Sequence, residues 1–307
     1  MAKIREGWAK YRPTTRKLVQ LGAALLQNAH LKGFAGGKIY TGQTKAVCVP
    51  GLNCYSCPAA VGACPLGALQ NALSVSAQRP AFYVIGLIGL FGLLLGRMIC
   101  GWLCPFGWIQ ELLYKTPGPK LRKSRVTRAL SWIKYGILAV FVVVLPLWYG
   151  LTRFPVPAFC KYICPAGTLE GAAGLLIHPA NAGLRSMLGE LFSLKAAILA
   201  LTVIACVFVY RAFCRFICPL GAIYSLFSRI ALAGVRVEAP ACSGCGACVR
   251  TCRMDVLRVG DRECIHCGEC MDVCPEKAIS IRAGKIVLKG PESGKAVSAG
   301  HKNRATA

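Results

Sequence analysis

The chain has 307 residues, 55% of them hydrophobic, with 19 cysteines and a formal net charge of +25. Its length and apolar character exclude a small secreted disulfide scaffold, and its cysteine count exceeds that of an ordinary soluble enzyme, so metal ligation is the better interpretation. A mean hydropathy of +0.51 indicates a membrane protein. Such proteins gather Lys and Arg in cytoplasmic loops, so the positive charge does not indicate a nucleic-acid partner.

Four apolar segments are predicted to cross the membrane as helices, because about 20 apolar residues span its hydrocarbon core. In chain order they are 17–35, 82–99, 129–150 and 195–213. The first segment carries several polar residues, and an amphipathic helix at the membrane interface is the alternative for it.

Basic residues set the predicted orientation. Six Lys or Arg lie in residues 1–17 and six in the 100–128 loop, against three in 36–81 and three in 151–194. Cytoplasmic segments carry the excess of positive charge. We therefore expect a multi-pass protein of the cell inner (cytoplasmic) membrane, with its N-terminus and its C-terminal domain in the cytoplasm.

A short motif that begins Cys-Pro, with glycine two residues after the proline, occurs four times. We call these motifs Cys-Pro copies 1 to 4, and they begin at Cys64, Cys104, Cys164 and Cys218. In copies 2 to 4 a further cysteine lies four residues upstream, at Cys100, Cys160 and Cys214. The proline is expected to end one helix, and the glycine to allow a tight turn.

Two C-x3-C-P units together supply the four thiolates of a [4Fe-4S] cluster. Copies 2 and 4 are predicted to hold one cluster at the cytoplasmic side, the inner site, through Cys100, Cys104, Cys214 and Cys218. Four of five outer cysteines are predicted to hold another cluster, the five being Cys54, Cys57, Cys64, Cys160 and Cys164.

The outer group is irregular because copy 1 has Ala60 where its upstream cysteine would stand. Cys54 or Cys57 must replace it, and Cys48 is a further substitute or a buried thiol. A pair of disulfides is the alternative interpretation of this group. Cys206 lies alone in an apolar segment and is interpreted as a packing residue.

Each Cys-Pro copy is followed by an apolar stretch that is too short to span a membrane. These stretches are 66–78, 106–114, 166–178 and 220–232, and we expect them to be re-entrant or interfacial helices. Such helices would hold the inner and outer clusters closer together than the length of a span.

Near the C-terminus, eight cysteines have the spacing of a two-cluster bacterial ferredoxin, in which the fourth cysteine of each run ligates the other cluster. Cluster 1 is assigned to Cys242, Cys245, Cys248 and Cys274. Cluster 2 is assigned to Cys264, Cys267, Cys270 and Cys252. A zinc site is the alternative interpretation. Zinc sites typically use two C-x2-C pairs, and two runs of four cysteines do not fit that spacing. The metal predicted at all these cysteines is iron.

These features predict an α-helical integral membrane protein with about four transmembrane helices, short re-entrant or interfacial helices, and a C-terminal α+β ferredoxin-like domain. The predicted boundaries are 1–232 for the membrane domain and 233–283 for the two-cluster ferredoxin-like domain. Residues 284–307 are predicted to be a short β-element and a disordered basic tail.

No catalytic motif is visible in the sequence, so we expect substrate chemistry in another subunit. His30 and His178 are interpreted as packing or interface residues, with haem or quinone contact as the alternative. His266 is interpreted as a residue that tunes a ferredoxin cluster. A quinone is a further candidate cofactor.

The sequence resembles the polyferredoxin-like membrane iron–sulfur proteins, which include the membrane quinol-dehydrogenase subunit of periplasmic nitrate reductase systems and the membrane regulator of nitrous oxide reduction. The likeness is carried by Cys100-Gly101-Trp102-Leu103-Cys104-Pro105, by Cys214-Arg215-Phe216-Ile217-Cys218-Pro219 and by the two ferredoxin runs. The resemblance implies an electron-transfer subunit that works between quinol or a cytoplasmic donor and a redox partner protein. The alternative is a membrane assembly or maturation factor that reduces a metalloenzyme through its clusters.

Overall fold

The computed structural model describes residues 15–75, 82–152 and 155–290. Most of the N-terminal basic segment and of the predicted basic tail lies outside the described residues. The elements up to residue 152 are α2 (Thr15–Gln27), α3 (Lys32–Gly36), η1 (Gln43–Ala46), α4 (Pro65–Val75), α5 (Phe82–Leu95), α6 (Met98–Trp102), α7 (Pro105–Tyr114), α8 (Arg125–Leu130), α9 (Ile133–Ile137), the π-helix η2 (Leu138–Val144) and α10 (Leu145–Thr152). The following elements are α11 (Ala158–Tyr162), the π-helix η3 (Gly167–Ala173), α12 (Gly174–Leu176), η4 (Pro179–Asn181), α13 (Ala182–Ser186), α14 (Glu190–Phe208), α15 (Ala212–Phe216), α16 (Pro219–Phe227), β1 (Ala233–Val237), η5 (Ala239–Ala241), α17 (Ala247–Thr251), α18 (Glu269–Asp272), β2 (Ile279–Ala283) and β3 (Ile286–Lys289).

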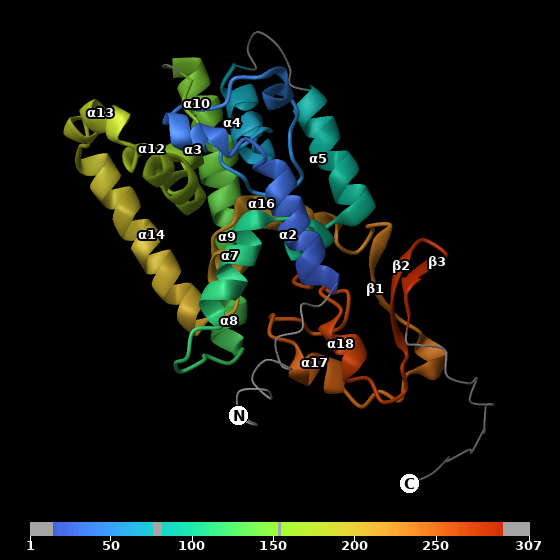
Figure 1. The fold of residues 1–307 in the computed structure, drawn as a ribbon. Helices are drawn as coiled ribbons and strands as arrows, with labels where there is room; N and C mark the ends of the chain where they lie inside the picture. The colour runs from blue at the N-terminus through green and yellow to red at the C-terminus, as the bar shows by residue number, and fades with distance from the viewer. Residues whose placement is uncertain (1–14, 76–81, 153–154, 291–307) are drawn as a thin grey trace, which may run out of the picture.

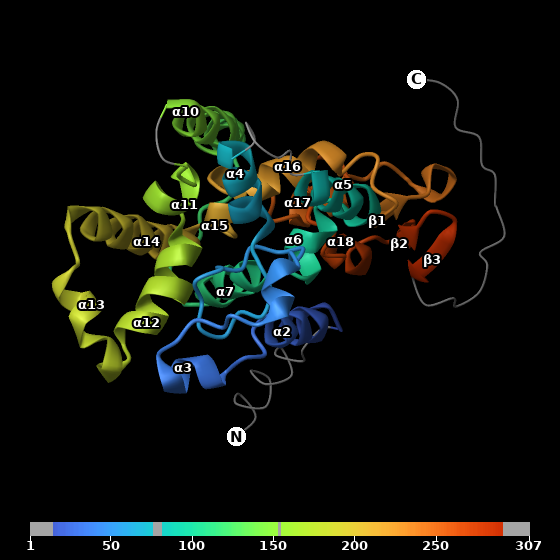
Figure 2. The same ribbon diagram turned by 90° about the horizontal axis from the view of Figure 1, so that it is seen from above.

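The long elements run between two ends of the molecule in alternating directions (Figure 1). α2 leads away from the end that carries α17 and α18, α5 returns, the continuous run from α8 to α10 leads away again, and α14 returns. Seen from above, α4, α7, α15 and α16 lie between the side formed by α12 to α14 and the β-sheet (Figure 2). The helices that follow copies 1, 2 and 4 therefore lie between these two sides, whereas α12, which follows copy 3, belongs to the side formed with α13 and α14.

Two helices in the described part of the chain are long and apolar enough to cross a membrane. They are Arg125–Thr152, with 28 residues, and Glu190–Phe208, with 19 residues. Only 22% and 11% of their most apolar windows are buried in the protein, so most of these side chains face outward, unlike those of a core helix. The two helices contain the predicted span 129–150 and most of the predicted span 195–213.

The other two predicted spans are shorter in the structure than the sequence analysis expects. The 82–99 segment forms α5 with 14 residues, because Gly96 adopts a φ of +50° and interrupts the helix. The 17–35 segment is divided into α2, with 13 residues, and the separate α3, with 5 residues. Apolar composition did not show these interruptions, because a bend at a glycine or a polar residue leaves the average hydropathy high.

A three-stranded antiparallel sheet in the order β1-β2-β3 belongs to the C-terminal part. The register of β1 and β2 places Val235 opposite Ile281, and both side chains pack beside Cys270 and Cys274. β3 lies beyond residue 283, so the sheet includes the short β-element predicted after the domain boundary.

Buried ion pairs fasten this C-terminal part to the helices. Arg97, which precedes α6, and Lys134 in α9 both lie 2.6 Å from the Glu263 carboxylate, and all three side chains are buried. Burial alone would raise the pKa of Glu263, but the two cations hold it at about 2. Arg215 in α15 pairs in the same way with the buried Asp255. Breaking one partner of such a pair leaves an unpaired buried charge, so these pairs favour a single docking geometry.

A second buried charge cluster joins α2 to α7. Glu111 lies 2.7 Å from Arg16 and 2.6 Å from Arg211, and the Tyr210 hydroxyl donates to it at 2.8 Å. Burial would raise the pKa of Glu111, but Arg211 and Arg16 lower it to about 2. Arg211 also donates to the Cys100 carbonyl. The cluster therefore fixes the position of one of the predicted inner-site cysteines.

We expect Glu111→Gln to destabilise the protein by about 3–5 kcal/mol, because two buried guanidinium groups lose their counter-charge. The pKa of Glu111 is about 2, below its ordinary value of 4.5. Its contribution to stability is therefore fully present above a pH of about 4.5 and is lost as the pH falls through 2. Thermal unfolding of the purified protein, followed by circular dichroism, measures both effects.

The unfolding midpoints of wild type and Glu111→Gln should converge as the pH falls from 4.5 to 2. Glu276→Gln, at an exposed position, is the matched control and should behave as wild type. Equal midpoints of wild type and Glu111→Gln at neutral pH would show that the cluster does not stabilise the fold.

Candidate metal centres

The three C-x3-C-P units share one backbone conformation. The upstream cysteine of each unit lies in a five-residue helix, which is α6, α11 or α15. The N–H of the second cysteine donates to the carbonyl five residues before it, at 3.0 Å for Cys104, 3.0 Å for Cys164 and 2.9 Å for Cys218. The preceding residue has a φ of −117°, −117° and −115° in the three units. The repeated sequence therefore forms a repeated structure.

The second cysteine of each unit stands at the start of a helix, with proline as the first helical residue. The Gly167 N–H donates to Cys164 Sγ at 3.4 Å, and the Gly221 N–H donates to Cys218 Sγ at 3.3 Å. The tight turn predicted at the glycine is wrong, because none of the four glycines has a positive φ. Each lies in the first helical turn, where backbone N–H groups stabilise a negatively charged sulfur.

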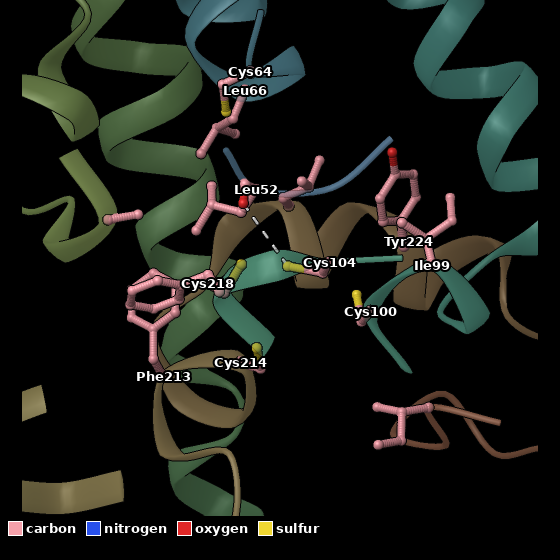
Figure 3. Packing of buried hydrophobic residues seen from close by; sticks show 14 of the residues in the cluster. Leu52, Cys64, Leu66, Ile99, Cys100, Cys104, Phe213, Cys214, Cys218 and Tyr224 are labelled. Atoms are coloured by element: carbon pink, nitrogen blue, oxygen red, sulfur yellow. Dashed lines mark hydrogen bonds between the residues drawn. The ribbon is translucent and has the colours of Figure 1, made fainter. Parts of the chain in front are cut away.

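The four inner-site cysteines surround one small cavity. Cys100 and Cys104 line it from copy 2, and Cys214 and Cys218 line it from copy 4. All four are buried, and their sulfurs lie around the same space in Figure 3. The Arg97 guanidinium donates to the Cys214 carbonyl at 3.2 Å. Copies 2 and 4 thus form one site, although more than 100 residues separate them in the sequence.

Four of the five outer cysteines line a second, larger cavity of about 540 Å³. They are Cys54, Cys64, Cys160 and Cys164, which we call the outer site. Cys57 does not line this cavity. Its thiol instead lies 3.8 Å from Asn28 Oδ1, in the wall of a separate cavity. Copy 1 thus meets copy 3, and Cys54 takes the place of the upstream cysteine that copy 1 lacks.

The inner and outer cavities are neighbours. Leu52 lines both of them, and Figure 3 shows Leu52 between Cys64 on one side and Cys104 and Cys218 on the other. The loop that carries Leu52 packs so closely that a Cβ on Gly51 would lie 2.9 Å from the Cys104 Cα. Only glycine allows this approach, so the backbone of the loop separates the two sites by little more than one residue.

Cluster 2 of the ferredoxin-like part has a preformed cavity. Its predicted ligands Cys252, Cys264, Cys267 and Cys270 all line one cavity, together with Ile265. Of the predicted cluster 1 ligands, Cys248 and Cys274 pack in the neighbouring core, and Cys242 and Cys245 are exposed. The arrangement places cluster 2 toward the helices and cluster 1 at the surface.

The cluster 2 cavity lies directly against the inner site. A Cβ on Gly101 would lie 2.2 Å from the Ile265 carbonyl oxygen, so only glycine fits beside Cys100 at this contact. The Trp102 indole N–H donates to the His266 carbonyl at 2.9 Å. Ile265, next to the predicted cluster 2 ligand Cys264, and Gly101, next to Cys100, therefore lie between the two sites.

His266 is buried among the cluster 2 ligands. Burial lowers the pKa of its imidazole to about 4, with help from Arg236 and Arg97, so the ring is neutral at pH 7. Its Nδ1 accepts from the Val235 N–H at 3.0 Å, and its Nε2 bonds to the Ser228 hydroxyl at 3.2 Å. The ring joins β1 to the end of α16 and holds the ligand segment in place.

The remaining cysteines and histidines contact other groups. The Cys206 thiol lies 3.6 Å from Gln110 Oε1, and Cys48 is buried in an isolated bridge with Ala63. His30 bonds to the Pro58 carbonyl at 3.2 Å, and His178 bonds to the Ala35 carbonyl at 2.9 Å. Backbone partners therefore account for both histidines. Two glutamines, Gln70 and Gln110, bond to cysteine sulfurs and were not predicted from the sequence.

The donor sets fit [4Fe-4S] clusters. All 19 cysteines are free thiols, so the disulfide alternative for the outer group is not realised. Among the described residues, no group of three or more His, Cys, Asp or Glu side chains converges to hold a single metal ion. The inner and outer sites each present four thiols around a cavity, which is the ligand set of a cubane cluster. The cluster 2 cavity is lined by its four predicted ligands and also by Cys248, which is assigned to cluster 1.

Comparisons with known proteins agree with this donor chemistry. Residues 77–124, 135–179 and 194–237 match a family model described as a 4Fe-4S binding domain, and residues 260–280 match a second model with this description. Each of the first three segments contains one C-x3-C-P unit. The comparisons confirm the prediction of [4Fe-4S] clusters.

Three relatives show the extent of the similarity. An uncharacterized protein of Methanocaldococcus jannaschii is 31% identical over 63% of this chain and 75% of its own length. The ferredoxin-type protein NapH of Escherichia coli is 28% identical over 62% of this chain and 64% of its own length. The methylamine utilization ferredoxin-type protein MauN of Paracoccus denitrificans is 32% identical over 56% of this chain and 54% of its own length. No solved structure matches the chain.

We expect about 16 iron atoms and as many acid-labile sulfides per chain, because four sites of four cysteines each hold one cubane cluster. Chemical iron and sulfide analysis of anaerobically purified protein measures this. About 8 iron atoms per chain, with the ferredoxin signals intact, would show that the inner and outer sites hold no cluster.

Cys54→Ser and Cys57→Ser form a matched pair that tests the outer site. Cys54 lines the outer cavity and Cys57 does not. We expect Cys54→Ser to lose about four iron atoms per chain and Cys57→Ser to keep the wild-type content. Loss of iron in Cys57→Ser with retention in Cys54→Ser would reverse the assignment.

Proposed function

Because the chain belongs to the family of ferredoxin-type 4Fe-4S proteins, we propose that it is a membrane-bound electron-transfer subunit. It passes electrons between quinol or a cytoplasmic donor and a redox partner protein at the opposite face of the membrane. The [4Fe-4S] clusters, when bound, supply one-electron carriers, and the protein holds them in order and keeps them apart from water. The ligands are the cysteines of cluster 1, cluster 2, the inner site and the outer site.

The single observation that carries this proposal is the direct succession of the four sites. Cys270 of cluster 2 packs in one core with Cys274 of cluster 1. Ile265 of the cluster 2 cavity touches Gly101 beside the inner site, and Leu52 lies in the walls of the inner and the outer cavities. Leu52 and Ile265 are both buried, so the proposed route between neighbouring sites runs through packed protein.

The two ends of this series differ from its middle. Cys242 and Cys245 of cluster 1 are exposed, and Cys54 and Cys160 of the outer site are half-buried beside the large cavity. The four inner-site cysteines are all buried. Redox partners can therefore approach the terminal sites, while the inner site exchanges electrons only with its neighbours.

A membrane location is supported by the two outward-facing apolar helices and by the basic loops. The run from α8 to α10 and α14 are long enough to span, and α2 and α5 accompany them in alternating directions. We propose that all four cross the apolar region, although α2 and α5, with 13 and 14 residues, are shorter than the other two. The basic 115–128 segment and the ferredoxin-like part then lie in the cytoplasm, and the outer site faces the opposite side.

A cavity of about 320 Å³ is the candidate location for a quinone. It is lined by the apolar side chains of Leu31, Phe34 and Trp108, with the polar groups of Asn28 and Glu170. Pockets of this size, mostly apolar with a few polar groups, are typical of small-molecule sites. Glu170 also accepts a hydrogen bond from the Cys54 N–H at 2.7 Å, so the cavity adjoins the outer site.

Electron passage through the chain alone is tested in sealed vesicles. The protein is reconstituted with an electron acceptor enclosed and an impermeant reductant added outside. We expect the enclosed acceptor to be reduced by wild type and to stay oxidised with Cys104→Ser, which interrupts the series at the inner site. Iron analysis and paramagnetic resonance of the same samples show which clusters each protein contains.

One outcome would contradict conduction across the membrane. If the enclosed acceptor stays oxidised with wild type that contains all four clusters, the chain alone does not connect the two faces. The remaining function would then be electron exchange on one face of the membrane, with quinol or with a bound partner. Cys57→Ser serves as the matched cysteine control in vesicles without quinone, since Cys57 lies outside the outer cavity and its loss should leave reduction unchanged there.

A further inference from the structure

One position recurs in all four Cys-Pro copies and contacts the site in a repeated way. It lies six residues after the Cys-Pro cysteine and is occupied by Gln70, Gln110, Glu170 and Tyr224 in copies 1 to 4. The sequence motif does not include it, because the residue type changes from copy to copy. The structure shows that it faces the partner copy across each site.

In copy 1, the side chain of Gln70 is fully buried. Its amide nitrogen donates to Cys160 Sγ at 3.3 Å and to the Leu66 carbonyl at 3.2 Å. Its amide oxygen accepts from the Phe159 N–H at 2.8 Å. Gln70 therefore holds the upstream cysteine of copy 3 through both the sulfur and the adjacent backbone.

In copy 2, Gln110 repeats this pattern at the inner site. Its amide nitrogen donates to Cys214 Sγ at 3.0 Å and to the Phe106 carbonyl at 3.3 Å. Its amide oxygen accepts from the Cys214 N–H at 3.3 Å, and the Cys206 thiol lies 3.6 Å from that oxygen. The bonds to sulfur and to the carbonyl four residues earlier match those in copy 1, and the backbone donor is Cys214 itself, whereas in copy 1 it is Phe159, the residue before the cysteine.

The other two copies use different residue types at the same position. Glu170 of copy 3 accepts from the backbone N–H of Cys54, the cysteine that stands in for the upstream cysteine of copy 1. Tyr224 of copy 4 lines the inner cavity beside Cys100, and its hydroxyl donates to the Pro50 carbonyl at 2.9 Å. In this position only the two glutamines donate a hydrogen bond to a cysteine sulfur.

We propose that Gln70 and Gln110 are positioning residues that set the reduction potentials of the outer and the inner cluster, respectively. The inference rests on the proposed cysteine ligand sets. An N–H group that donates to a ligand sulfur stabilises the more negative, reduced cluster, so it raises the reduction potential. Each glutamine contacts one site only, so each tunes its own cluster and leaves the other unchanged.

The test is reciprocal. Gln70→Met and Gln110→Met keep the length of the side chain and remove its hydrogen bonds, and redox-titrated paramagnetic resonance follows both clusters in each protein. The inner signal is identified by its loss in Cys104→Ser and the outer signal by its loss in Cys54→Ser. We expect the ratio of reduced to oxidised cluster at a fixed potential to fall about tenfold, a shift of about 59 mV for one electron.

The expected shift is confined to the outer signal in Gln70→Met and to the inner signal in Gln110→Met. Gln70→Leu and Gln110→Leu provide a second pair if the Met variants do not fold, because leucine is also apolar and removes the hydrogen-bond donor. These variants should shift the same signals in the same direction. The exposed Gln43→Met is the control and should shift neither signal.

Potentials that stay unchanged in both glutamine variants, with full iron content, would overturn the inference. Equal shifts of both signals in each variant would also overturn it, because they indicate a general structural change. Failure of the proposed function would look different, since a chain without inner and outer clusters would lack iron and both signals before any glutamine is changed.

Discussion

The fold depends on one requirement, that cysteines from two Cys-Pro copies distant in the sequence meet at a single site. Copy 1 meets copy 3, and copy 2 meets copy 4, so the copies that share a site alternate along the chain. The chain must therefore cross the molecule between successive copies, which explains why the long elements alternate in direction. The helix that follows each copy directs the N–H groups of its first turn at the sulfur of the Cys-Pro cysteine.

Buried charges fix the position of the C-terminal part against the helices, as the shared cysteine sites fix the helices against one another. Glu263 is paired with Arg97 and Lys134, and it directly precedes Cys264, a proposed ligand of cluster 2. Arg97 also donates to the Cys214 carbonyl of the inner site. Desolvating these ions is costly, and apolar residues would dock the two parts at least as stably. Ion pairs also orient the two parts, because the Glu263 carboxylate must lie within reach of both Arg97 and Lys134.

Patterns of spacing could be read from the sequence, while contacts across the fold could not. The ferredoxin spacing and the C-x3-C-P units predicted [4Fe-4S] clusters, since ligand spacing is local. The choice between Cys54 and Cys57 depends on how a loop meets copy 3, which no local pattern encodes. Gly96 interrupts a helix that its apolar neighbours predicted to be continuous. Gln70 and Gln110 were overlooked because a glutamine in an apolar helix has no signature until its partner sulfur is placed.

The burial of the middle sites has a consequence for how the chain works with partners. The four inner-site cysteines are buried and leave no surface for a redox protein, so in the proposed series this site exchanges electrons with cluster 2 or with the outer site. Because the Ile265 and Gly101 contact is a backbone approach and not a mobile side-chain contact, the step between cluster 2 and the inner site does not require domain motion. In the proposed series, partners therefore dock at the ends, beside the exposed Cys242 or beside the large outer cavity. On this proposal, the interior of the chain sets the order and the potentials of the clusters, and the partners at its two surfaces set the direction of flow.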